Sequence, residues 1–162
     1  MLKKYLFSIC LTFIFVNQAC SQDIKKTLDF IIVIDDNISV GSIASLQIEL
    51  MSANGREIVP ASYYPGNLSL AENDYRKLFS DSVKFINLSF TYYAYIGQNQ
   101  IADKYDIELK KEWLRDYFNI LRIYDLNKKK YKGRYSPNGL SKNYAYEIES
   151  PSHSFRLIEK KN

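Results

Sequence analysis

The sequence contains few of the residues on which most catalytic and metal-binding sites are built. Among its 162 residues there are two cysteines, one histidine and one tryptophan. Cys10 and Cys20 both lie in or at the edge of an N-terminal apolar segment, so the remainder of the chain has no cysteine pair for a disulfide. Because His153 is the only histidine, no zinc ligand set is available, and we expect neither a metal nor a cofactor.

No spacing typical of a catalytic motif is present either. A serine triad would need a distant serine and a distant carboxylate to meet at His153, and the sequence has no nucleophile-elbow spacing. The run Asp35-Asp36-Asn37 matches no calcium-binding loop and is typical of a turn. The sequence therefore predicts a protein that is not an enzyme.

The chain also lacks an apolar run long enough for a membrane-spanning helix. The run from Tyr5 to Val16 has about 12 residues, whereas a spanning helix needs about 20. It follows Lys3 and Lys4 and gives way to polar residues, which is the layout of a secretory signal peptide. We expect residues 1–19 to be that signal peptide and the protein to be exported.

The residues around Cys20 resemble a bacterial lipoprotein signal. Ala19 before the cysteine and Ser21 after it fit the pattern, whereas Asn17 stands where the pattern has Leu or a similar apolar residue. The resemblance implies that Cys20 is acylated and that the protein is a periplasmic or outer-membrane lipoprotein. The alternative is cleavage after Ser21 and secretion as a soluble protein.

The length after the leader predicts a single domain. Without residues 1–19 about 140 residues remain, which is the usual size of one domain. Residues 20–26 are polar and are interpreted as a tether, followed by the domain at residues 27–162.

The charge of the chain does not favour nucleic acid as a partner. The formal charge is +4, and it becomes about +2 without Lys3 and Lys4. The densest basic run includes Lys129, Lys130 and Tyr131. We interpret it as the solvated tip of a hairpin, with contact to an anionic membrane or glycan as the alternative.

Sheet-forming residues are abundant, with 14 tyrosines and nine phenylalanines. They predict an all-β chain folded as a single antiparallel β-sandwich of about seven or eight strands, with an immunoglobulin-like topology among the candidates and one short helix near residues 70–79. The expected strands are 28–34, 45–51, 56–63, 82–96, 105–109, 118–126, 144–148 and 155–158. The expected shared core is Ile32, Leu46, Ile48, Leu50, Leu88, Phe90, Ile120 and Ile148.

Two functional hypotheses of different class follow. The first is a non-catalytic exported envelope module that binds or inhibits another protein. The alternative is a carbohydrate-binding or carbohydrate-cleaving module that uses a tyrosine-rich face. A sugar site requires a concave set of aromatic rings with carboxylates or amides at its edges, whereas a protein-binding patch can be flat. The candidate partner-binding residues are Tyr63, Tyr64, Tyr93, Tyr95, Lys129, Lys130 and Tyr131.

The lipid anchor is directly testable. Replacing Cys20 by serine should release the protein from the membrane and leave its domain folded, because two or more acyl chains supply the attachment and no other cysteine pairs with Cys20. Metabolic labelling with a palmitate analogue and mass spectrometry of the mature N-terminus measure this. An unlabelled chain that begins at Gln22 would contradict it.

Overall fold

The computed structural model describes residues 24–39, 42–138 and 142–158, so Cys20 and the leader lie outside the described residues. Within that part of the chain there are twelve strands and two short helices, and no helix is long and apolar enough to cross a membrane. In chain order the elements are β1 (Lys25–Leu28), β2 (Phe30–Ile34), β3 (Asn37–Ile38), β4 (Ile43–Ser52), β5 (Gly55–Pro60), β6 (Ser62–Tyr64), β7 (Asn67–Ala71), α2 (Glu72–Leu78), β8 (Val83–Ile96), β9 (Asn99–Leu109), α3 (Lys111–Leu114), β10 (Asn119–Asp125), β11 (Tyr144–Glu149) and β12 (Ser154–Phe155).

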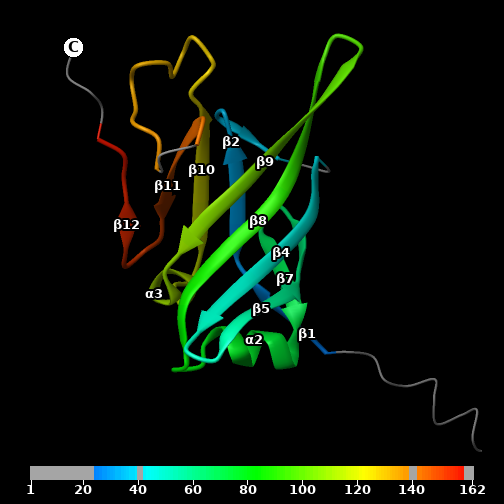
Figure 1. Cartoon of the computed structure of the whole chain (residues 1–162), viewed down its shortest axis with the longest axis vertical. Helices are drawn as coiled ribbons and strands as arrows, with labels where there is room; N and C mark the ends of the chain where they lie inside the picture. Colours follow the sequence, from blue (N-terminus) through cyan, green and yellow to red (C-terminus); the bar gives the residue numbers. More distant parts are fainter. Residues whose placement is uncertain (1–23, 40–41, 139–141, 159–162) are drawn as a thin grey trace, which may run out of the picture.

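The strands form three sheets around one core. A four-stranded sheet has the order β5-β4-β8-β9, a five-stranded sheet the order β12-β11-β10-β2-β3, and a three-stranded sheet the order β1-β7-β6. In Figure 1 the four-stranded sheet lies in front and its strands cross those of the five-stranded sheet at an angle. Buried side chains from all three sheets belong to one cluster, which makes the chain an all-β sandwich-like protein as the sequence predicted.

Two features of the sheets differ from the sequence-based expectation. An immunoglobulin-like sandwich has two sheets, whereas this chain has three. The pairing is antiparallel with one exception, since β2 and β10 run parallel. The predicted strand 28–34 divides at Asp29, where β1 joins the three-stranded sheet and β2 the five-stranded one. The predicted strand 56–63 divides in the same way into β5 and β6.

Local signals in the sequence place several turns correctly. Pro60 ends the edge strand β5, where a missing N–H group costs no ladder bond. Gly66, in the turn between β6 and β7, has a φ of 89°, a conformation that glycine after Pro65 favours in a type II turn. Asp35 and Asp36 have φ values of 51° and 67° and join β2 to β3, which is the pattern of a two-residue type I′ hairpin turn.

The predicted core is correct except at one position. Ile32, Leu46, Ile48, Leu50, Leu88, Phe90 and Ile148 all belong to the buried cluster. Ile120 is only half-buried, and its neighbours Leu121 and Ile123 occupy the core instead. Strand β10 lies between β2 and β11 and has apolar residues on both of its faces, so the period of two does not determine which face is buried.

Tyrosine hydroxyls close the seams between the sheets. The Tyr144 hydroxyl, from β11, accepts a hydrogen bond from the Asp106 N–H (2.9 Å) and lies 2.8 Å from the Asp106 carbonyl oxygen, to which it can donate. The Tyr146 hydroxyl donates to the Glu108 carbonyl (3.3 Å). Both backbone positions lie on β9, the edge strand of the four-stranded sheet. The five-stranded sheet therefore completes an edge that would otherwise lack partners.

The opposite side of the sandwich is closed in a similar way. The Tyr63 hydroxyl, from β6, accepts a hydrogen bond from the Ile32 N–H of β2 (2.8 Å). The Gly66 N–H donates to the Phe30 carbonyl (3.0 Å) beside it. The three-stranded sheet is thus joined to the five-stranded one through the backbone of β2.

The seam at β9 predicts a specific loss of stability. Burial raises the pKa of Tyr144 to about 12, so its hydroxyl is a neutral donor and acceptor at all physiological pH values. Tyr144→Phe should lower the free energy of unfolding by about 1–3 kcal/mol, because it leaves the Asp106 N–H without this partner. Tyr64→Phe, at an exposed ring, should change it by less than about 0.5 kcal/mol in the same urea titration. Equal effects would contradict the seam.

Candidate functional site

The tyrosines predicted to bind a partner separate into structural and exposed residues. Tyr63 packs against the core, and its hydroxyl accepts a hydrogen bond from the Ile32 N–H of β2. Tyr131 is buried, and its hydroxyl donates to the Asp36 carboxylate (2.7 Å). Tyr93 is half-buried, whereas Tyr64 and Tyr95 are 67% and 70% exposed. The structure therefore does not bring the predicted tyrosines together on one surface.

The basic run is fixed to the β2–β3 turn. Lys128 forms an ion pair with Asp35 (2.6 Å), and Lys130 forms one with Asp36. Hydrogen bonds from Lys130 and Tyr131 lower the pKa of Asp36, and the hydrogen bond to Asp35 raises the pKa of Lys128. These pairs neutralise two of the lysines within the molecule.

Lys129 remains as an exposed side chain of that run. Lys132 of the same run is exposed as well. Two such lysines add little to the attraction of a whole molecule toward an anionic surface, because each charge contributes only about 1 kcal/mol near a membrane. The aromatic residues of the same segment pack inward, with the Tyr124 and Tyr131 ring centroids 5.1 Å apart. The run is a solvated loop that the Lys128–Asp35 and Lys130–Asp36 ion pairs hold to the β2–β3 turn.

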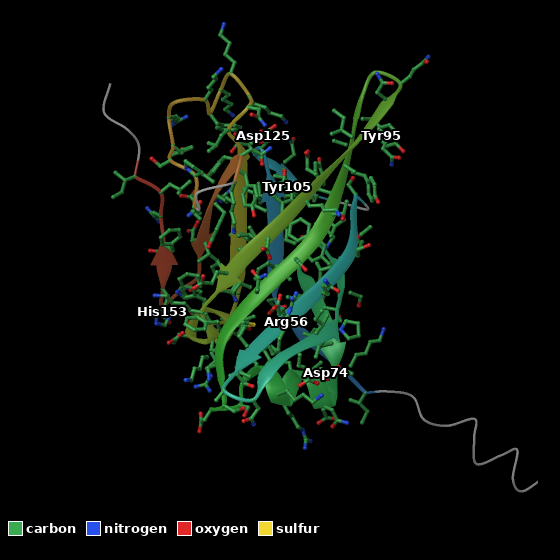
Figure 2. All side chains as sticks on the ribbon, viewed as in Figure 1. Arg56, Asp74, Tyr95, Tyr105, Asp125 and His153 are labelled. Atoms are coloured by element: carbon green, nitrogen blue, oxygen red, sulfur yellow. The ribbon has the colours of Figure 1, made fainter. Side chains whose placement is uncertain are left out.

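A serine, a histidine and a carboxylate do converge, at the β11–β12 turn. The His153 ring Nδ1 lies 3.1 Å from the Asp116 carboxylate, and Ser150 also hydrogen-bonds to that carboxylate. The Ser150 hydroxyl lies 2.6 Å from the His153 carbonyl oxygen and accepts from the His153 N–H, so it contacts the histidine backbone. A triad requires the serine hydroxyl to bond to the histidine ring. The cluster is a clasp that holds the turn, marked by His153 in Figure 2.

Asp103 of β9 and Asp125 of β10 face the same cavity, and Asp35 is near enough to act on Asp103 through its charge. Burial, followed by the negative charges of Asp125 and Asp35, raises the pKa of Asp103. Asp103 and Asp125 line a cavity of about 290 Å³ together with Tyr105, which Figure 2 labels beside Asp125. Across residues 24–39, 42–138 and 142–158, no group of three or more His, Cys, Asp or Glu side chains is arranged to hold a metal ion.

The outer face of the four-stranded sheet carries large apolar side chains. Strands β4 and β8 alternate, so Ile48, Leu50, Ile86 and Leu88 point into the core and the residues between them point outward. Met51, Ile58 and Phe85 are among the outward residues and are 41%, 49% and 57% exposed. We call these three the apolar corner.

The members of the apolar corner are neighbours on three adjacent strands. Met51 on β4 pairs directly with Phe85 on β8. Ile58 on β5 lies diagonally from Met51, because Arg56 is the direct partner of Met51. Direct cross-strand partners such as Met51 and Phe85 lie within reach of one another. The Arg56–Glu49 ion pair takes the other diagonal of the group and lies between Met51 and Ile58, so the apolar corner is a Met51–Phe85 pair with Ile58 on the far side of that ion pair.

Polar pairs lie among and beside the residues of the apolar corner. Arg56 forms an ion pair with Glu49, and Asn87 hydrogen-bonds to Asp106 on the same face. These groups bond to one another within the sheet. Protein–protein interfaces likewise combine large apolar side chains with paired polar groups.

The β8–β9 hairpin continues beyond the rest of the sheet as an arm. Strand β4 pairs with β8 as far as Ile43 and Tyr92, and the Tyr93 N–H donates to the Ser42 carbonyl (2.8 Å). Beyond this point β8 and β9 continue to pair with each other up to Ile96 and Asn99. Figure 1 shows this arm extending past the body, and Figure 2 labels Tyr95 on it. The Tyr95 hydroxyl accepts a hydrogen bond from the Gln100 side chain (3.3 Å). The arm presents Tyr95 on the same face as the apolar corner.

Sequence reasoning missed the apolar corner although a signal was present. Once Leu50 and Ile86 are placed in the core, the period of two places Met51 and Phe85 outside. Large apolar residues at outward positions are the informative exceptions to the pattern of burial.

Comparison with models of protein families, with curated proteins and with solved structures gave no match for this chain.

The clasp at Asp116 predicts a dependence of stability on pH. The hydrogen bond from Ser150 is the largest of the contributions that lower the pKa of Asp116 from 3.8 to about 2, and His153 adds to it. Because the folded pKa is the lower one, this stabilisation is complete above about pH 4 and is lost as the pH falls toward 2. In urea titrations, the free energy of unfolding of Asp116→Asn should fall less between about pH 4 and pH 2 than that of the unaltered protein.

The exposed Asp81 provides the control for this measurement. Asp81→Asn should keep the pH dependence of the unaltered protein. If both variants changed the dependence equally, the clasp would not be its source.

Proposed function

We propose that this chain is a non-catalytic exported envelope module that binds another protein through the outer face of its four-stranded sheet, held to a membrane by a lipid on Cys20. The observation that carries the proposal is the apolar corner of Met51, Ile58 and Phe85. Fully burying a side chain of this size contributes about 1.5–3 kcal/mol, and each of these three would contribute roughly half of that because it is 41–57% exposed. A partner that covers all three would gain most of the affinity of a typical hot spot.

The polar pairs at the corner support binding to a protein. The ion pair and the amide–carboxylate bond are already formed within the sheet, so covering the corner leaves these groups with the partners that they have. The exposed Tyr95 on the arm adds an aromatic side chain of the kind enriched in interfaces.

The position of the corner is compatible with an anchored partner. Strand β1, through which the chain leads back toward Cys20, packs against α2. Lys77 of α2 bonds to Glu57 of β5 (2.5 Å), and β5 carries one residue of the corner. In Figure 1, β1, α2 and β5 all lie at the lower end of the molecule. A lipid on Cys20 would therefore hold the corner near the membrane, as a periplasmic or outer-membrane lipoprotein would require.

The alternative of a sugar-binding module on the tyrosine-rich face has less support. Tyr63 is used by the fold, and Tyr93 and Tyr95 lie on one strand of the arm rather than around a hollow.

A pull-down tests the proposal: the tagged protein is mixed with detergent-solubilised envelope, and the proteins that bind to it are recovered and quantified. The double variant Met51→Thr/Phe85→Thr removes apolar area while keeping residues that favour strands. It should recover its partner at least about tenfold less than the unaltered protein, since hot-spot losses of 2 kcal/mol or more correspond to about thirtyfold.

Tyr117→Thr is the matched control, because Tyr117 is 85% exposed and lies outside the four-stranded sheet. It should recover the partner fully. The proposal fails if the double variant recovers the same proteins as the unaltered chain, or if Tyr117→Thr loses them equally. Circular dichroism of each variant verifies that the fold is retained.

A further inference from the structure

A pocket that does not include the apolar corner lies where the end of β9, α3, β11 and β12 meet. Its volume is about 250 Å³. Its lining comes from four short parts of the chain: Glu108, Lys110, Trp113, Asn138, Tyr146 and Phe155. None of these residues belongs to the apolar corner.

Three aromatic rings form the apolar part of this pocket. The Trp113 and Phe155 rings lie with their centroids 6.2 Å apart and their planes 25° apart, which is close to parallel. The Tyr146 ring lies 6.0 Å from Phe155. Trp113 and Tyr146 are largely buried, whereas Phe155 is 38% exposed on the two-residue edge strand β12. The rings thus make a hollow with one accessible aromatic side.

Three polar groups of different character stand around the rings. The Lys110 ammonium lies 5.5 Å from the centroid of the Trp113 ring. The negative charge of Glu108, after burial, contributes to raising the pKa of Tyr146, so that carboxylate acts on the same pocket. The Asn138 side-chain oxygen accepts from the Tyr146 N–H (2.6 Å), which fixes the amide at the pocket. The rim combines a carboxylate acceptor, an ammonium donor and an amide.

An aromatic hollow with such a rim matches one class of ligand in particular. A pyranose ring has an apolar side of C–H groups that packs on an aromatic ring, and a circumference of hydroxyls that both donate and accept hydrogen bonds. Aromatic rings that only pack against one another do not need hydrogen-bond donors and acceptors around them. The volume lies below the range of pockets for drug-sized ligands, about 300–1,000 Å³, and suits one ring.

We propose that this pocket binds a single pyranose residue of a glycan. The sugar ring packs against Phe155 beside Trp113, and its hydroxyls bond to Glu108, Lys110 and Asn138. The pocket shares no residue with the apolar corner, so either function can exist without the other, although Glu108 lies on the same outer face, as the cross-strand partner of Asn87.

The only tryptophan of the chain provides a reporter inside the pocket. The purified full-length protein is titrated with the methyl glycosides of glucose, galactose, mannose and N-acetylglucosamine, and the emission of Trp113 is followed. At least one of the four should change the emission in a saturable way with a Kd in the millimolar range, as expected for a small ligand on one shallow site. If none does, the proposal is overturned.

Variants that keep the tryptophan locate the binding. Phe155→Ala should weaken it at least about tenfold and Glu108→Gln at least about fivefold, whereas Tyr117→Ala should leave the Kd unchanged. Glu108 is exposed, so Glu108→Gln keeps the test decisive if Phe155→Ala fails to fold. An unchanged Kd in Glu108→Gln would contradict the assignment.

Tetramethylammonium chloride distinguishes a sugar site from a site for cations, because aromatic rings beside a carboxylate also bind quaternary ammonium groups. A saturable response to this salt without a response to any glycoside would overturn the proposal. A response to a glycoside that the salt does not compete with supports it.

Discussion

The hydrogen bonds between tyrosine hydroxyls and strand backbones are the interactions on which this arrangement of three sheets depends. Each open sheet has two edges with unpaired N–H and C=O groups, and burying such groups without partners costs about 1–3 kcal/mol each. Tyr144 and Tyr146 supply partners along β9, and Tyr63 supplies one along β2. The hydroxyl reaches across a seam where another strand would not fit, while the ring fills the space between the sheets.

This use of tyrosine explains why an aromatic-rich chain has few exposed aromatic clusters. Tyr105 and Tyr144 pack with ring centroids 5.0 Å apart between the two larger sheets, and Tyr124 bonds to Glu147 (2.7 Å) across two adjacent strands. The tyrosine content therefore reflects the joining of sheets. Surfaces available to partners are found where the sheets do not cover each other, on the outer face of the four-stranded sheet and at its end beside α3.

The sequence could predict what depends on nearby residues. Alternation along β4 and β8 determined which side is buried, and Pro65-Gly66 and Asp35-Asp36 determined turns through their backbone preferences. The seams could not be predicted, because Ile32 and Tyr63 are 31 positions apart and Asp106 and Tyr144 are 38 apart. A tyrosine whose hydroxyl bonds to the backbone of a distant strand has the same neighbouring residues in the sequence as a tyrosine that is exposed. The predicted binding residues Tyr63 and Tyr131 illustrate this ambiguity.

The two surfaces differ in what they demand from the fold, and this bears on how each could be recognised from sequence. The apolar corner needs only one sheet in register, since pairing of Met51 with Phe85 follows from the alternation that buries Leu50 and Ile86. The pocket needs β9, α3, β11 and β12 brought together by the tyrosine seam, because Tyr146 both bonds to the Glu108 backbone and lines the hollow. Weakening the seam should therefore disturb the pocket before it disturbs the corner, since the pairing of β4 with β8 does not pass through β11.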